Sequence, residues 1–451
     1  MAPSPTTPIR VEPKSVLETL GRHILVDGYH VVMDLKRSRG NFVYDALHGV
    51  EVLDFFSHFA TCPIGYNHPG LSDPAFLEEL TEAALTKPAN SDIYTRQMAE
   101  FVETFARVAV PASHSRHMFF VEGGALAVEN QLKAAFDWKV RRNLRRGYRR
   151  EVGHQVIHFE QAFHGRSGYT LSLTNTADQR KTMYFPKFPW PRIVNPKLTF
   201  PPTPEGLART EAVEKLAVAQ IRQALVDHRD DVAALIVEPI QGEGGDNHFR
   251  PEFFRELRTL CDENEMLFLL DEVQTGLGLT GRMWGYEHMG VEPDMFAFGK
   301  KTQVCGFASN DRVMSEPENV FTVSSRINST WGGNLVDMVR CRRFLEIIEE
   351  EKLVENARTV GEHLLARLAE LAAEFPGKMT NVRGRGLFVA FDLPDHATRN
   401  RVLACWLQKH AVMGLASGEH AIRLRPPLTL TAEEATLGVQ RLRAALAELL
   451  G

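Results

Sequence analysis

The stretch Met266–Lys301 reads MLFLLDEVQTGLGLTGRMWGYEHMGVEPDMFAFGKK and decides the predicted fold. It contains two short apolar runs, Met266–Leu270 and Met295–Phe298, each bounded by Gly, Pro, Asp or Glu. Short apolar runs between turn residues are typical of buried strands in a parallel sheet. Because ligands of open α/β sheets bind at the carboxyl ends of the strands, we expect the polar residues after these runs to face one crevice.

Polar side chains follow both runs. Asp271 and Gln274 come after the first run, and Lys300 and Lys301 come after the second. A pyridoxal cofactor needs a lysine for a Schiff base and an aspartate that keeps its pyridinium nitrogen protonated. These residues alone leave another interpretation open, because an Asp between a strand and a Gly-rich loop also caps helices or lines nucleotide sites.

Strands and helical patterns alternate along residues 117–300. Additional strands are predicted at His117–Val121, Gln155–Phe159 and Val232–Val237. This alternation predicts an α/β fold with a mostly parallel sheet and helices on both faces. The stretch Phe185–Pro204 is rich in Pro and lacks periodicity, so a long surface loop is predicted there.

The two ends of the chain are predicted to form smaller units that pack together. Val31–Leu35, Asn41–Ala46 and Val50–Phe56 alternate apolar and polar residues, which predicts an antiparallel meander. Later strands and helices predict a small α+β domain, which begins with a long helical stretch broken near Glu351–Glu355. The predicted division is residues 1–70 as a segment packing with the small domain, 71–333 as the large cofactor-binding domain and 334–451 as the small domain.

Composition and charge argue against several classes of protein. The net charge of −5 on 451 residues is small, which argues against broad nucleic-acid binding. The basic run Arg141–Arg150 is expected to be a solvated helix end and loop, since the rest of the chain is acidic. No apolar run reaches the roughly 18 residues of a membrane span, and the Pro-rich start lacks an apolar signal-peptide core, so a cytoplasmic protein is expected. The five cysteines are scattered without a CxxC pair, which indicates no metal site.

Three other places have the composition of a pocket wall. The Gly-rich turn Glu122–Ala125 joins a strand to a helix, where free N–H groups suit a phosphate, although a tight connection without a ligand gives the same pattern. Phe163, His164 and Arg166 follow a strand and offer an aromatic ring, an imidazole and a guanidinium. Glu243 lies among glycines, whose missing side chains leave room for a ligand.

Several motifs together resemble the class III pyridoxal phosphate aminotransferases of fold type I, a family that includes ornithine and 4-aminobutyrate aminotransferases. The resemblance extends from about Gly28 to the C-terminus. Within the family, FGKKTQVCG and NSTWGGN are most similar to the L-lysine 6-aminotransferase branch. The resemblance implies a seven-stranded type of sheet and pyridoxal 5'-phosphate as the cofactor. It is carried by GYNHP, FFVEGGALAVENQLKAA, AFHGRSGYTLSLTN, VEPIQGEGG, LLDEVQTGLGLTG, FGKK, STWGGN and IRLRPPLT.

The resemblance places the cofactor on the first lysine of the doublet. Many relatives carry one lysine, a short spacer and Gly-Gly, whereas this chain has KKTQVCG from Lys300 to Gly306. Adjacent strand residues point to opposite faces, so only one lysine can reach the ring. Lys300 would form the Schiff base and shuttle the proton, and Lys301 would be a solvated or ion-paired neighbour. Asp271 would pair with the pyridinium nitrogen, with Gln274 near the phenolic oxygen.

The other cofactor contacts are likewise implied by the resemblance. Gly124 and Ala125 would offer backbone N–H groups to the phosphate. Phe163 would stack on the ring, with His164 beside it. Thr330 would reach the phosphate of the neighbouring subunit, which implies a homodimer with shared active sites.

The resemblance also implies how two substrates share one pocket. Arg166 would hold the distal carboxylate of L-lysine and of 2-oxoglutarate, and Arg423 would hold the near carboxylate of 2-oxoglutarate or L-glutamate. Glu243 would neutralise Arg423 when lysine is bound and swing aside for the dicarboxylate, unless the two form a fixed ion pair. Gln274 would also contact the substrate.

The expected reaction is transfer of the ε-amino group of L-lysine to 2-oxoglutarate. It gives L-glutamate and (S)-2-amino-6-oxohexanoate, which cyclises to piperideine-6-carboxylate. The nearest alternative is another ω-aminotransferase that uses ornithine, 4-aminobutyrate or a diamine. An isomerising or decarboxylating enzyme of the same fold and a non-catalytic binding protein are more distant alternatives.

Overall fold

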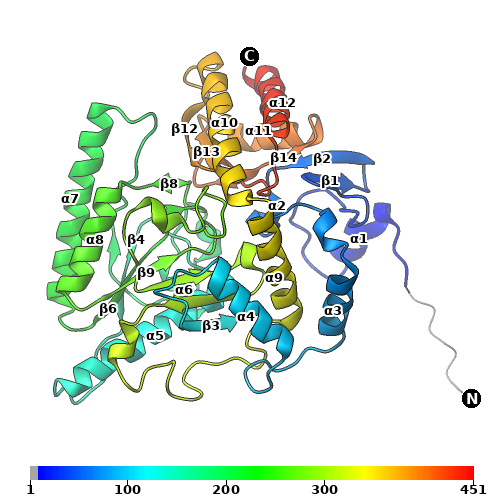
Figure 1. Ribbon diagram of the computed structural model, residues 1–451. Coiled ribbons are helices and arrows are strands. Elements are labelled where there is room, and N and C mark those ends of the chain that lie inside the picture. The colour runs from blue at the N-terminus through cyan, green and yellow to red at the C-terminus, as the bar shows by residue number, and fades with distance from the viewer. Residues whose placement is uncertain (1–8) are drawn as a thin grey trace, which may run out of the picture.

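The computed structural model describes residues 9–451; the first eight residues of the predicted N-terminal segment lie outside the described part. Its centre is a seven-stranded sheet (Figure 1). β11 runs antiparallel to both of its neighbours and the other pairs are parallel, which confirms the predicted mostly parallel α/β fold. In spatial order the strands are β3 (His117–Val121), β11 (Cys305–Ser309), β10 (Met295–Phe298), β9 (Leu267–Asp271), β6 (Val232–Val237), β4 (Gln155–Phe159) and β5 (Arg192–Ile193).

Helices cover both faces of this sheet, because its central strands are continuously apolar and present apolar side chains to both faces. On β9, Leu267 and Leu269 pack in the same cluster as Trp138 of α5 (Gly124–Arg145). Phe268 and Leu270 pack on the opposite face, in the cluster that contains Phe254 and Leu257 of α8 (Pro251–Glu263). These four apolar side chains of β9 are fully buried. The carboxyl ends of β9 and β10 are thereby held side by side, with Ala297 opposite Asp271.

The two ends of the chain meet, as predicted. β14 (Val412–Met413) pairs in parallel with β2 (Val50–Asp54), which pairs with β1 (Phe42–Asp45). The prediction of a first meander strand at Val31–Leu35 is wrong, because this segment forms only one isolated bridge, between Met33 and Asp45. The predicted division into three parts stays a prediction. A second sheet has the order β12 (Thr380–Arg385), β13 (Phe388–Asp392), β16 (Ala421–Leu424) and β15 (Leu415–Ser417).

Helices pack around these two sheets. The long helical stretch is broken as predicted, because Lys352 adopts a left-handed conformation with φ 53° between α9 (Leu335–Glu350) and α10 (Leu353–Glu374). None of the helices among the described residues combines the length and the apolarity needed to cross a membrane. The remaining elements are α1 (Val16–Gly21), α2 (Ser57–Ala60), α3 (Pro74–Leu85), α4 (Arg96–Val108), α6 (Gly168–Leu173), α7 (Pro204–Asp227), β7 (Ile240–Gln241), β8 (Asn247–His248), α11 (His396–Gln408) and α12 (Ala432–Leu450).

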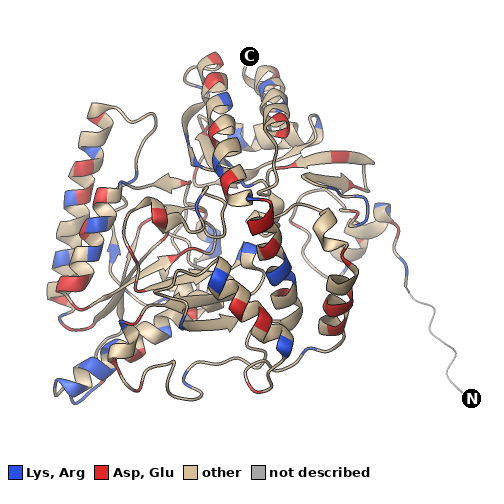
Figure 2. Cartoon of the chain, in the orientation of Figure 1, with Lys and Arg blue, Asp and Glu red and all other residues tan. Residues whose placement is uncertain are grey.

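Two further expectations are corrected. The stretch Phe185–Pro204 is not wholly a surface loop, because it supplies the edge strand β5 and buries Trp190. The basic run at the end of α5 (Figure 2) is not simply solvated. Arg142 is ion-paired with Glu265 at 2.7 Å and with Glu316 at 3.4 Å, and Arg145 is also ion-paired with Glu316. These pairs neutralise much of the basic run.

Candidate active site

A cavity of about 490 Å³ opens at the carboxyl ends of β6 and β9. It brings together most of the residues that the sequence predicts for the cofactor, although they come from segments far apart in the chain. The order of the sheet explains this convergence, because the loops after neighbouring parallel strands meet at one edge. The cavity is lined by Gly124, Ala125, Phe163, His164, Gly165, Arg166, Ser167, Glu238, Asp271, Val273, Gln274 and Lys300.

Asp271 is fixed at the floor of this cavity. Its Oδ2 atom lies 2.8 Å from Nδ1 of His164, and its Oδ1 accepts a hydrogen bond from the backbone N–H of Val273 at 3.0 Å. Asp271 and His164 are both buried. The second ring nitrogen of His164, Nε2, is buried without a hydrogen-bond partner among residues 9–451. A carboxylate held in this way offers a fixed negative charge to a cationic ring nitrogen in the cavity.

Lys300 follows β10 and begins the short 3₁₀ turn Lys300–Thr302. Its φ of 55° turns the chain sharply, and its side chain lines the cavity that Asp271 also lines. Burial lowers the pKa of the Lys300 amine below its usual range, and the charge of Asp271 partly opposes that shift. Lowering the pKa increases the neutral fraction, the form that attacks an aldehyde and accepts a proton.

The neighbouring lysine has an environment that the sequence did not predict. Lys301 is neither solvated nor ion-paired: it is 2% exposed, and its Nζ donates to the backbone carbonyl of Gln274 at 2.8 Å. Burial lowers the pKa of Lys301 well below its usual value, and the nearby Lys300 adds to this effect. Lys301 therefore tethers the loop after β9 and does not line the cavity.

Gln274 connects the cavity to two buried arginines. Its Oε1 accepts hydrogen bonds from Nη1 of Arg423 at 3.2 Å and from Nη2 of Arg425 at 3.0 Å. Arg425 is neutralised by Asp246, with an Nη2–Oδ1 distance of 2.7 Å. Sequence reasoning missed the role of Arg425, although it stands two residues after Arg423 in the RLRPP stretch. The arrangement fixes the amide of Gln274 and leaves Nη2 of Arg423 for a contact with an anion.

Glu243 is the anion that Arg423 binds in this structure. Its Oε2 lies 2.6 Å from Nη2 of Arg423, and its Oε1 contacts Nζ of Lys181. Arg423 is 3% exposed, and its Nε has no hydrogen-bond partner in the described part of the chain. Burial opposes ionisation of Glu243, but Arg423 and Lys181 together lower its pKa below the usual range. The predicted Glu243–Arg423 contact is therefore present, and Lys181 is an addition that sequence reasoning missed.

Glu238 is another buried acid that was not singled out from the sequence. It follows β6, and its two oxygens accept hydrogen bonds from the backbone N–H groups of Phe163, at 2.9 Å, and Gly242, at 3.0 Å. Burial raises the pKa of Glu238 to about 7, and the charge of Asp271 adds to this shift. Glu238 thus connects the loop that carries Phe163 with the loop that carries Glu243.

The predicted phosphate contacts lie where a helix begins. Gly123 has a φ of 98° and no side chain caps the first turn of α5, so its N-terminal N–H groups keep the donor capacity that suits an anion. A Cβ atom on Gly124 would come within 2.9 Å of Cγ1 of Val273, which explains a glycine at this position. With Lys300, Asp271 and the unpartnered His164 nitrogen in the same cavity, these residues fit pyridoxal phosphate.

The remaining predicted residues lie at or beyond the edge of the cavity. Arg166 lines it but is exposed. Thr330 does not line it: the residue is exposed, and its backbone oxygen accepts a hydrogen bond from the Ser91 hydroxyl at 3.4 Å. The role of Thr330 toward a neighbouring subunit stays a prediction.

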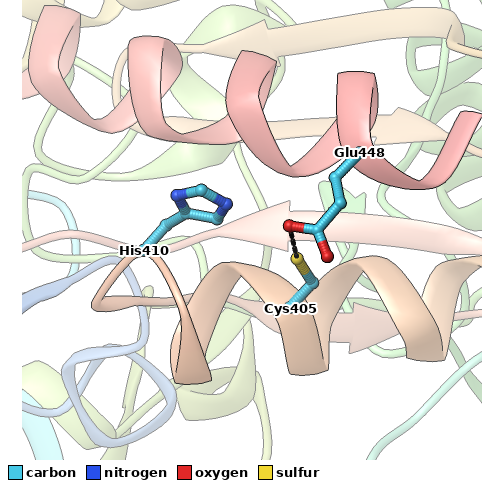
Figure 3. Close-up of side chains that lie close together, drawn as sticks. All are labelled: Cys405, His410 and Glu448. Atoms are coloured by element: carbon cyan, nitrogen blue, oxygen red, sulfur yellow. Dashed lines mark hydrogen bonds between the residues drawn. The ribbon is translucent and has the colours of Figure 1, made fainter. Parts of the chain in front are cut away.

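One group of potential metal ligands lies elsewhere, between α11 and α12 (Figure 3). The donor atoms of Cys405, His410 and Glu448 lie within 4.8 Å of one another, and the thiol is 3.8 Å from the carboxylate. Donors of one tetrahedral zinc are about 3.5 Å apart. Lys409 already forms an ion pair with Glu448, and burial raises the pKa of Cys405, so we assign no metal to this group.

Comparison with known proteins identifies the family. The sequence model of the aminotransferase class-III family matches residues 25–446. The chain is 52% identical to an L-lysine-epsilon aminotransferase of Mycobacterium tuberculosis, covering 99% of this chain and 97% of that protein. A relative of the same name from Amycolatopsis lactamdurans is 49% identical, covering 99% and 98%.

Solved structures agree with this result. A lysine aminotransferase from M. tuberculosis in the internal aldimine form matches with a TM-score of 0.94 and 51% identity, covering 97% of this chain and all of that one. An ornithine aminotransferase from Toxoplasma gondii, at 22% identity and a TM-score of 0.79, shares the fold, covering 98% of this chain and 96% of that one. The family match, the identity to curated relatives and the geometry of the cavity agree, and the chain belongs to the class-III aminotransferases.

Proposed function

We propose that this protein transfers the ε-amino group of L-lysine to 2-oxoglutarate and releases L-glutamate and (S)-2-amino-6-oxohexanoate. The aldehyde then cyclises with its own α-amine to piperideine-6-carboxylate. Relatives named L-lysine-epsilon aminotransferase, about half identical over nearly the whole chain, support the choice of lysine. The observation that carries the choice of a second, dicarboxylate substrate is the 2.6 Å contact between Glu243 and Arg423 beside the cavity.

Pyridoxal phosphate, when bound, supplies an electron sink for the carbon that loses a proton. The chain contributes the groups around it. Lys300 is the amine that holds the cofactor and, when free, accepts the proton from the substrate carbon and returns it. Its lowered pKa favours the neutral amine that both tasks need. Asp271, oriented by His164, keeps a negative charge opposite the ring nitrogen.

The rest of the cavity binds and orients the cofactor. Gly124 and Ala125 present N–H groups at the start of α5 to the phosphate. Phe163 would stack on the ring, and its backbone N–H is held by Glu238. Gln274, fixed by Arg423 and Arg425, would bind near the phenolic oxygen.

Three charged residues sort the two substrates. Arg166, exposed at the cavity wall, binds the distal carboxylate of either substrate. Arg423 binds the carboxylate beside the keto group of 2-oxoglutarate, because a guanidinium matches a carboxylate with two parallel hydrogen bonds. Lysine has no carboxylate at that end, so Glu243 remains on Arg423 and neutralises a buried charge that would otherwise be costly. Glu243 therefore acts as an internal substitute for the missing substrate carboxylate.

The active form is proposed to be a homodimer that shares its active sites. Thr330 does not line the cavity of its own chain, and it is exposed next to Trp331, which is 42% exposed. An exposed indole beside a hydroxyl suits burial against a second copy. In that arrangement Thr330 would bind the cofactor phosphate of the partner subunit.

The test is incubation of the holoenzyme with L-lysine and 2-oxoglutarate, with the cyclic imine trapped by an aromatic amino-aldehyde and glutamate measured in parallel. We expect both products in equal amounts. Ornithine, 4-aminobutyrate and a diamine are assayed beside lysine. A clear preference for one of these would replace lysine as the donor, and consumption of lysine without glutamate would contradict transamination.

A further inference from the structure

The Glu243 carboxylate is held between two cations that come from different parts of the chain. One oxygen contacts Arg423 on β16, and the other contacts Lys181 at the end of the 3₁₀ turn Gln179–Lys181. The side chains of Glu243 and Lys181 are 20% and 27% exposed, so water screens their contact only in part. Arg423 has a described role toward substrate, whereas Lys181 does not line the cofactor cavity.

The structure provides space on the Lys181 side. Glu243 and Lys181 line a second cavity of about 520 Å³, which is bounded by the segment Thr176–Lys181 and by the loop Ala416–Glu419. Glu243 lines this second cavity and not the cofactor cavity. Its partner Arg423 links it to the cofactor cavity, because Nη1 of Arg423 donates to Gln274 in the wall of that cavity. A carboxylate that leaves Arg423 can therefore move into the second cavity.

The backbone around Glu243 is fixed, which restricts any such movement to the side chain. The carbonyl of Glu243 accepts a hydrogen bond from the N–H of Gly418 at 3.0 Å. The preceding Gly242 is held on both sides, by Glu238 at 3.0 Å and by the Ser417 hydroxyl at 2.7 Å. Rotation about side-chain bonds is then sufficient to take the carboxylate off Arg423 while it stays on Lys181.

The two arginines at the second cavity already have partners. Arg399 donates from Nη1 to the backbone carbonyls of Ser417, Gly418 and Glu419 at 3.0–3.3 Å. Arg180 forms a two-point contact with Asp178, at 2.8 and 2.9 Å. Among residues 9–451, the ion pairs of Glu243 are those with Lys181 and Arg423.

We propose that Lys181 is the counter-ion that receives Glu243 when a dicarboxylate takes its place on Arg423. This inference deepens the proposed function and rests on it. With Glu243 on Arg423, the carboxylate shares its charge between two ion-pair partners; once displaced, it keeps Lys181 as its ion-pair partner. Removal of Lys181 therefore destabilises the displaced state more than the resting state. Lys181 is a positioning residue that sets dicarboxylate affinity through Glu243 and does not touch the substrate.

The test is titration of the holoenzyme with glutarate, a five-carbon dicarboxylate without a keto group, by calorimetry. In Lys181→Met we expect the dissociation constant for glutarate to rise about tenfold, which is the change expected when one hydrogen bond to a charged group is lost. Lys181→Arg keeps the cation and should restore most of the affinity. Arg180→Met removes a charge from the same segment and is the matched control, with no change expected.

A second background separates an indirect role from a direct one. In Glu243→Gln there is no carboxylate to receive, so Lys181→Met should leave glutarate affinity unchanged. The single-turnover rate of Lys181→Met with lysine should stay within about twofold of the wild-type rate, since Glu243 remains on Arg423 when lysine is bound. A rate in this range also shows that the variant folds correctly. Unaltered glutarate affinity in Lys181→Met, an equal loss in Lys181→Arg, or the same loss in the Glu243→Gln background would overturn the proposal. Failure of the wild-type enzyme to react with lysine would instead contradict the proposed donor, and the glutarate comparison would still decide the role of Lys181.

Discussion

Replacing Glu243 with Gln removes the negative charge opposite Arg423 and nearly preserves the shape of the side chain. The carboxylate oxygen is 2.6 Å from the guanidinium, and Arg423 is almost fully buried. A neutral amide can still accept a hydrogen bond there but cannot cancel the charge. Lysine, which presents no carboxylate to Arg423, must then react beside a buried positive charge. 2-Oxoglutarate no longer has to displace an anion.

The size of the effect follows from the contact. A hydrogen bond between charged groups contributes about 1.5–3 kcal/mol, which corresponds to roughly 10- to 150-fold in an equilibrium constant. The retained amide contact and the 20% exposure of Glu243 place the loss toward the lower end. We therefore expect kcat/KM for lysine to fall about tenfold and kcat/KM for 2-oxoglutarate to rise.

Single-turnover kinetics of the two half-reactions measure this directly, because each substrate is mixed alone with the corresponding cofactor form of the enzyme. The ratio of kcat/KM for lysine to that for 2-oxoglutarate should fall about tenfold or more in Glu243→Gln. An equal change in both half-reactions would indicate a general effect on the active site. Unchanged kinetics in both would refute the switch and leave Glu243–Arg423 as a fixed structural pair.

Three further perturbations test other parts of the account. Arg166→Gln should raise KM for both lysine and 2-oxoglutarate about tenfold, since both distal carboxylates use it; a change for one substrate only would contradict that role. Lys301→Met should lower the free energy of unfolding by about 1–3 kcal/mol in urea, because the Gln274 carbonyl loses a donor, while the cofactor absorbance persists; loss of that absorbance would reassign the lysine. Burial, with help from Arg192, lowers the pKa of His158 to about 3. Because the unfolded chain binds this proton below about pH 6.5 and the folded chain does not, stability should fall as pH drops from 6.5 toward 3, by up to about 1.4 kcal/mol per pH unit. His158→Gln should remove this part of the pH dependence, and identical pH profiles would contradict the assignment.

Strands of the central sheet were predictable where apolar residues dominate a short run. β10 and β6 are unbroken apolar runs, β3 and β4 contain one and two polar residues, and all four coincide with their predicted ranges. β11 escaped notice because Gly306 and Ser309 interrupt its apolar pattern, and β5 because two residues give no periodicity. Both strands are formed by pairing with neighbours that sequence patterns do not reveal.

The residues of the cofactor cavity were predictable because they stand in motifs at strand ends. Ion pairs between distant segments were harder to foresee. Lys181 lies 62 residues from Glu243, in a stretch without regular periodicity, and only the folded chain brings the two side chains together. The expectation for Lys301 failed for a related reason. The sequence indicated that only one of the two lysines can point into the cavity. It did not indicate that the amine of the other would be buried and donate to a backbone carbonyl.

The central claim is that Lys300 is the amine that carries the cofactor opposite Asp271. Borohydride reduction of the holoenzyme converts the linkage into a stable secondary amine, and fragmentation mass spectrometry of the peptide that contains Lys300 and Lys301 locates it to one residue. We expect the added mass on Lys300, with none on Lys301. A modified Lys301, or a cofactor linked outside this doublet, would contradict the assignment.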